Sequence, residues 1–166
     1  MKSTANFAEH PIHPMLIPYP FAFLSGALGF RLAAAARGSQ SLEQTANHLR
    51  AAGIASAIVA AVPGAVDYFT VVPAGAVRQK ATVHALSNSG ALVCFSAAAL
   101  ASRNGEAGRR RVLGLETLGT LLLSVGGWLG GSLSYHHHVG VVDGTSAEEL
   151  RGSTNLAAFE LHNVGP

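Results

Sequence analysis

Four histidines and one aspartate stand at the ends of long apolar stretches, where they could bind a metal ion. His13 opens the first stretch, Asp67 lies near the end of the second, and His84 opens the third. His137 follows the fourth stretch, and His10 precedes the first. A neutral imidazole nitrogen can ligate zinc, copper, iron or haem iron, and a carboxylate can complete such a site or orient a ligating imidazole. All five side chains are therefore candidate metal ligands, and His13, His84 and His137 are candidate cofactor ligands.

The four apolar stretches are the elements that must position these side chains. Each has close to the ~20 residues that a helix needs to cross the bilayer core. The stretches are Met15–Ala36, Ala51–Val72, Ala81–Ala101 and Val112–Tyr135. In a chain that crosses a membrane four times, the starts of spans one and three share a face with the ends of spans two and four. The sequence therefore predicts that the five side chains gather at one rim of the bilayer.

The composition favours membrane insertion over a soluble bundle. Apolar residues make up 49% of the chain and charged residues only 12%, and the mean hydropathy is +0.32. A soluble helical bundle of this size needs more surface charge. Helices satisfy their own backbone polar groups where no water is present. We therefore expect an all-α, integral membrane four-helix bundle with both termini on the same side. Residues 1–142 form the four-span domain and residues 143–166 an extracytoplasmic C-terminal tail.

The basic residues predict the orientation. The sequence pI is near 9.0, yet arginines crowd the first and third connections rather than forming a nucleic-acid-binding surface, so no nucleic acid partner is expected. By the positive-inside rule those connections are cytoplasmic, which places the histidine face and both termini outside the cytoplasm. The arginines concerned are Arg37, Arg50, Arg103, Arg109, Arg110 and Arg111.

Each candidate ligand also has a purely structural interpretation. Asp67 either ligates a metal or holds the turn after its span by hydrogen bonds. His84 is followed one helical turn later by Asn88, so it either ligates a metal or joins a buried polar network between spans. His10 lies far up the tail, and most of the 136–138 histidine run is expected to be solvated.

Two charged residues and a glycine pair lie within the spans. Arg31 either pairs with Glu116 or extends its guanidinium group to the interface. Gly126 and Gly130 are spaced four residues apart in the fourth span. This spacing favours close packing of another helix.

Four segments together resemble an uncharacterised bacterial family of four-span membrane proteins, a domain of unknown function. They are HPIHP (His10–Pro14), PGAVDYFTVVP (Pro63–Pro73), HALSNSGAL (His84–Leu92) and GGWLGGSLSYHHHVGV (Gly126–Val141). The resemblance covers Glu9 to about Val142. It implies a location in the bacterial cytoplasmic (inner) membrane.

The resemblance also implies a shared site. The family pattern places its histidines and aspartate on His10, His13, Asp67, His84 and His137. The chain departs from the pattern at His136 and His138, where the family has a basic residue and a glycine, and this affects the geometry around His137. An association of relatives with Rieske-type iron–sulfur proteins implies electron transfer.

Three functions from different classes follow. The first is a redox membrane subunit that binds haem b or another transition metal (iron, copper or zinc), with Asp67 orienting a ligand, and that works with other membrane or redox subunits. The second is a non-redox zinc or copper site for metal handling or hydrolysis, which requires an open coordination position. The third is a structural subunit that anchors or assembles a larger complex. The sequence leaves open whether the protein is an enzyme.

Overall fold

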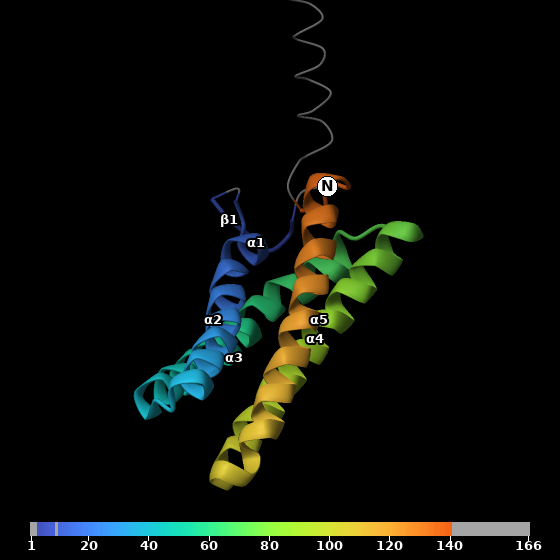
Figure 1. The fold of residues 1–166 in the computed structure, drawn as a ribbon. Helices are drawn as coiled ribbons and strands as arrows, with labels where there is room; N and C mark the ends of the chain where they lie inside the picture. Colours follow the sequence, from blue (N-terminus) through green and yellow to red (C-terminus); the bar gives the residue numbers. More distant parts are fainter. Residues whose placement is uncertain (1–2, 9, 141–166) are drawn as a thin grey trace, which may run out of the picture.

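The part of the chain that the structure describes is a bundle of four long helices (Figure 1). The computed structural model describes residues 3–8 and 10–140, without the side chains of residues 106 and 107. The long helices are α2 (Pro18–Arg37), α3 (Gln40–Thr70), α4 (Ala76–Ala101) and α5 (Arg109–Tyr135). Shorter elements are the antiparallel pair β1 (Asn6–Phe7) and β2 (His10–Pro11), then α1 (Ile12–Leu16) and the 3-10 helix η1 (Ser102–Gly108). All four long helices are long and apolar enough to cross a membrane. The predicted all-α class with four membrane-length helices is confirmed, and the placement of both termini on one side stays a prediction.

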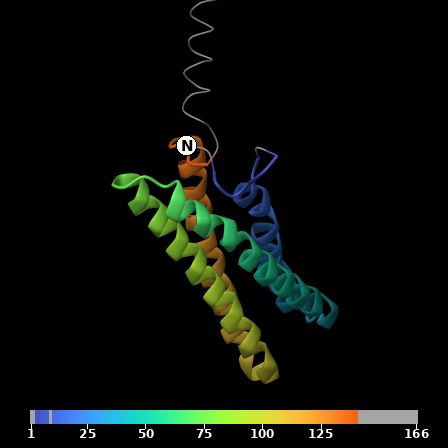
Figure 2. The ribbon, with the colours of Figure 1, turned by 180° about the vertical axis from the view of Figure 1, so that it is seen from behind.

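The bundle consists of two helical hairpins. Helix α2 packs along α3, and α4 packs along α5, while contacts of α2 with α5 and of α3 with α4 join the hairpins. Both ribbon views show the hairpins diverging toward the α2–α3 connection and η1 (Figures 1 and 2). The histidine-bearing starts of the first and third spans lie at the other end, where the hairpins cross.

The second span begins earlier than its apolar stretch suggests. Gly38 ends α2 in the left-handed conformation with φ of 61°, which costs glycine no steric strain. Ser39 then caps α3, since its Oγ accepts a hydrogen bond from the backbone N–H of Leu42. The helix consequently starts at Gln40 rather than near Ala51.

This early start places polar residues on one helical face. Glu43, Asn47 and Arg50 are spaced four and three residues apart in α3, so they lie on the same side of the helix. Arg50 is buried rather than solvated, with 4% of its surface exposed.

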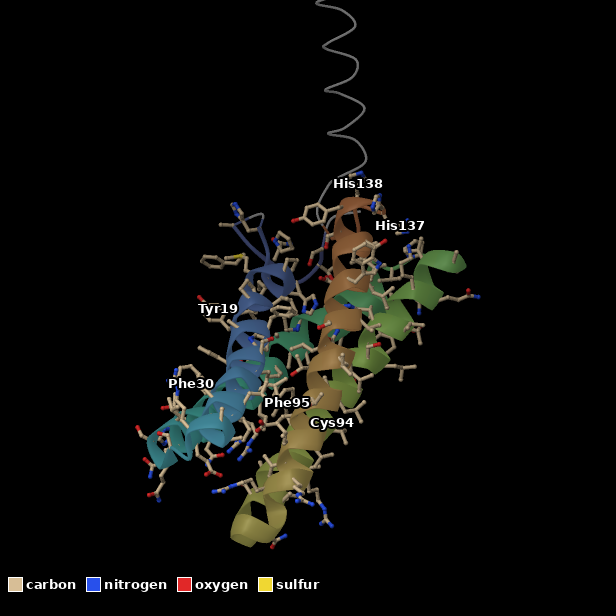
Figure 3. All side chains as sticks on the ribbon, in the orientation of Figure 1. Tyr19, Phe30, Cys94, Phe95, His137 and His138 are labelled. Carbon is tan, nitrogen blue, oxygen red and sulfur yellow. The ribbon has the colours of Figure 1, made fainter. Side chains whose placement is uncertain are left out.

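The interior is narrow and the outer faces are apolar. Leu24 and Phe95 are almost fully buried between the hairpins, and Figure 3 shows Phe95 in this central position. On the outside, Trp128 is 82% exposed and Phe69 76% exposed. Large apolar side chains on the surface of a long apolar helix are suited to contact with lipid chains.

The described ends of the chain meet at the histidine end of the bundle. The backbone N–H of Ser3 donates to the carbonyl of Gly140 at 3.4 Å. The predicted tail, 143–166, lies outside the described residues, so the domain boundary stays a prediction.

Candidate metal centre

His13 lies in the short helix α1 and rests on the backbone of α3. Its Nδ1 is 2.8 Å from the carbonyl oxygen of Ala60. A β-carbon added at Gly64 would come within 2.7 Å of the His13 ring, so only glycine allows the ring to lie this close to the helix. Pro63 lies between these two residues inside α3 and has no N–H for the helical ladder. The local sequence of α3 therefore provides both a hydrogen-bond acceptor and the space for the ring.

His84 makes the same kind of contact with the backbone of the other hairpin. It lies in α4, and its Nδ1 is 2.8 Å from the carbonyl oxygen of Gly126 in α5. A β-carbon at Gly130 would approach the His84 ring to 2.9 Å. The side-chain amide nitrogen of Asn88 donates to the His84 carbonyl at 2.9 Å and lies 3.3 Å from both ring nitrogens. The glycine spacing thus provides the close packing expected from sequence, and the group it accommodates is an imidazole.

The two rings lie close to each other where the two hairpins meet. The centroids of His13 and His84 are 6.3 Å apart and the ring planes are perpendicular, at 89°. Because a carbonyl oxygen only accepts hydrogen bonds, Nδ1 of each ring carries the proton, which assigns the tautomer from the contacts. In this tautomer Nε2 of each ring holds the lone pair, and at His84 the amide nitrogen of Asn88 lies 3.3 Å from it. Metal-ligating histidines are commonly oriented in this way by a backbone carbonyl.

The separation of the rings limits the kind of centre that fits. Imidazoles bonded to one ion at about 2.0–2.1 Å have centroids roughly 6.4 Å apart on opposite sides of the ion, and roughly 5.2 Å apart at a tetrahedral angle. The value of 6.3 Å is closer to the first of these two separations. A tetrahedral zinc site would therefore require the two rings to move closer together.

His137 lies apart from this pair in a different polar contact. It follows the last turn of α5 and is exposed, as Figure 3 shows at the end of that helix. The ammonium group of Lys80 donates to its Nε2 at 3.0 Å and to the hydroxyl of Ser132 at 3.0 Å. This contact occupies the His137 lone pair and places a positive charge where a metal ion would sit.

Asp67 and His10 also have local partners. Asp67 is 8% exposed, and its Oδ1 accepts a 2.6 Å hydrogen bond from the hydroxyl of Ser3. The ring of the exposed His10 bonds through Nδ1 to the carbonyl of Ala8 at 2.7 Å. The acid therefore fastens the N-terminal segment to the end of α3, a contact that span lengths alone do not indicate.

The five candidate ligands are consequently distributed among separate contacts. Across residues 3–8 and 10–140, no three His, Cys, Asp or Glu side chains lie close enough to hold a metal ion together. Only the pair His13 and His84 combines mutual proximity with oriented rings.

A second polar group lies at the opposite end of the bundle. Glu116 has 0% exposure and accepts hydrogen bonds from Arg31 at 3.1 and 3.2 Å. It also accepts one from Arg50 at 2.9 Å. Of the two interpretations of Arg31, pairing with Glu116 is the one found. The sequence analysis did not predict that Arg50 binds Glu116. Its spacing from Glu43 and Asn47, which places the three residues on one face of a helix, could have indicated this contact.

Four membrane-length helices, polar side chains gathered at both ends and lipid-suited outer faces define a four-span helical membrane protein. The chain belongs to the DUF2231 family, described as predicted membrane protein, whose model matches residues 9–143. No curated protein and no solved structure matches the chain.

Proposed function

We propose that the protein is a redox subunit of the bacterial inner membrane, in which His13 and His84 hold haem b or another transition metal and pass electrons to other membrane subunits. The observation that supports this is the perpendicular ring pair at 6.3 Å, with each Nδ1 bound to a carbonyl. Two oriented Nε2 lone pairs suit a centre that needs two protein ligands.

Haem b is favoured over zinc by the number of ligands available. Haem b would need no more than two protein ligands, which His13 and His84 would supply. Structural zinc takes four protein ligands and catalytic zinc three, and within the described residues no such group surrounds the pair. The haem would supply one-electron chemistry. The residues of this chain would orient the ligands through Ala60 and Gly126.

A structural role is the second candidate. Each histidine bonds to a carbonyl of its own hairpin, His13 to α3 and His84 to α5. These bonds would brace the two hairpins even without a metal. In this case the protein would serve to anchor or assemble a larger complex.

The test is an optical spectrum and metal analysis of detergent-purified protein expressed with an adequate supply of haem and iron. We expect a Soret band, about one iron atom per protein chain, and reversible reduction by dithionite. His13→Ala and His84→Ala should each lose the band. The matched controls His10→Ala and His137→Ala remove imidazoles from the same end and should retain it.

Two outcomes would count against the proposal. Wild-type protein without a Soret band and without stoichiometric iron or copper would favour the structural role. Loss of the cofactor in His137→Ala to the same extent as in His84→Ala would show that the centre uses a different set of ligands.

A further inference from the structure

The N-terminal segment, residues 3–8, is bonded to both helical hairpins at the histidine end. Ser3 is 2% exposed, and its hydroxyl donates to Oδ1 of Asp67, in α3, at 2.6 Å. The backbone N–H of Ser3 donates to the carbonyl of Gly140, which follows α5, at 3.4 Å. Figure 1 shows the described chain starting beside the end of α5. One buried residue therefore connects this segment to α3 and to the end of α5.

The other end of the segment is bonded to the start of α1. The backbone N–H of Ile12, the residue before His13, donates to the carbonyl of Ala5 at 2.9 Å. Between these contacts, the hydroxyl oxygens of Thr4 and Thr70 are 2.6 Å apart. The segment thus links the end of α3 to the helix that carries His13.

Helix α1 depends on such contacts because little else fixes it. It has five residues, none of them buried, and a helix this short is not stable by itself. Pro18 and Pro20, in the first turn of α2, have no N–H for the helical hydrogen bonds that would reach back to α1. The two helices are therefore joined less rigidly than one continuous helix would be.

The two rings of the pair consequently differ in how they are held. His84 lies within the 26-residue helix α4, so the whole helix fixes its position. His13 lies in α1, and the contact of its Nδ1 with the Ala60 carbonyl requires α1 to remain against α3. Release of the N-terminal segment would act on His13 and leave His84 in place.

We propose that Ser3 and Asp67 are positioning residues for His13, and that docking of the N-terminal segment on α3 brings the two rings together. Undocking of the segment would let α1 move away from α3 and would separate His13 from His84. The positions of the rings depend on the chain alone, whereas control of a bound cofactor by this segment rests on the proposed function.

The test measures distances between spin labels by pulsed electron paramagnetic resonance on the full-length protein in nanodiscs. The background is Cys94→Ser, which removes the one cysteine. One label pair, Met15→Cys in α1 and Leu86→Cys in α4, reports on the two helices that carry the rings. A second pair, Leu32→Cys in α2 and Leu118→Cys in α5, reports on the rest of the bundle. All four positions are exposed.

The variants Ser3→Ala and Asp67→Ala should each add longer distances to the first label pair and leave the second pair unchanged. Asp67→Asn keeps an oxygen that accepts from Ser3, so it should retain the distances of the parent. The matched control Ser124→Ala removes a hydroxyl that bonds to the carbonyl of Thr120 in its own helix, and it should change neither pair.

The optical spectrum separates the positioning role from the proposed function. If wild-type protein shows a Soret band, Ser3→Ala and Asp67→Ala should reduce it together with the change in distance. A band that persists unchanged while the distances lengthen would overturn control of the cofactor by the segment. If wild-type protein lacks the band, the proposed function fails, and the distances still decide the positioning role.

Two results would overturn the positioning role. One is a distance distribution of the first label pair that neither Ser3→Ala nor Asp67→Ala changes. The other is an equal change in both label pairs, which would mean that the contact supports the bundle as a whole rather than α1.

Discussion

The ring of His13 meets the ring of His84 at a right angle, with centroids 6.3 Å apart, although the two residues belong to different hairpins. Each ring is held by its own hairpin, on Ala60 or on Gly126, and not by the other ring. The position of the pair therefore depends on how closely α1 approaches α3 and how closely α4 approaches α5.

Substitution of the two glycines beneath the rings should displace the pair. A β-carbon at Gly64 or Gly130 would lie 2.7 or 2.9 Å from a ring atom, and overpacking of this kind costs about 1–3 kcal/mol. We expect Gly64→Ala and Gly130→Ala to lower the Tm and, if the centre is present, to lower its occupancy. Thermal denaturation and the optical spectrum would measure both.

The control for these variants is Gly114→Ala, also in α5. No heavy atom lies within 4 Å of an added β-carbon there. Alanine is favoured over glycine in a helix by up to about 1 kcal/mol, so this variant should be neutral or slightly stabilising. Equal losses in Gly114→Ala and Gly130→Ala would show that the ring contact is unimportant.

Much of the fold could be predicted because bilayer thickness fixes the length of each span. The apolar stretch Val112–Tyr135 agrees with α5 (Arg109–Tyr135), and Ala81–Ala101 agrees with the end of α4. The polar connection Gly38–Asn47 suggests a helix start around Ser41, close to the observed start of α3 at Gln40, whereas the apolar stretch begins only at Ala51 because counting apolar residues ignores a capped polar turn. The hydroxyl of Ser39 stabilises that turn outside the apolar stretch.

The site could be predicted only in part. The alternation of span directions indicates which residues share a rim, and His13 and His84 do lie together. It does not indicate where a residue lies around the rim, since this depends on helix rotation and on the chain beyond the helix ends. His137 follows the last turn of α5, and the ammonium group of Lys80, from α4, donates to its ring nitrogen.

The contact of Asp67 with Ser3 should stabilise the N-terminal segment. Both residues are buried, and the hydrogen bond to a charged acceptor is 2.6 Å long. A double-mutant cycle with Ser3→Ala and Asp67→Ala should give a coupling energy of about 1.5–3 kcal/mol. Thr4→Ala is the control, because its hydroxyl meets Thr70 at an exposed position, and it should cost far less.

The same cycle separates this role of Asp67 from ligation. Asp67→Asn retains an oxygen that accepts from Ser3, so cofactor content should remain near that of wild type. Loss of cofactor in Asp67→Asn, with the Tm unchanged, would instead indicate that Asp67 takes part in binding the metal.

Removal of the buried charge of Glu116 should destabilise the whole bundle. Glu116→Gln would leave Arg31 and Arg50 facing a neutral amide in a site with 0% exposure. Breaking a buried ion pair from one side costs about 3–5 kcal/mol. Glu43→Gln, at a position 31% exposed, should cost about 1 kcal/mol or less. Unfolding in denaturing detergent would measure both, and similar costs for the two variants would contradict the central role of Glu116.

The orientation of the bundle can be tested with single cysteines. The chain has one cysteine, the buried Cys94, so Cys94→Ser gives a background without thiols. Ala74 lies between α3 and α4 and Asn104 lies in η1, and both are exposed. Arginines near Asn104 predict that this end is cytoplasmic. In intact cells, a membrane-impermeant maleimide should therefore label Ala74→Cys at once and Asn104→Cys only after permeabilisation. The reverse pattern would place the His13–His84 pair at the cytoplasmic rim, so that the proposed redox subunit would exchange electrons on the cytoplasmic side.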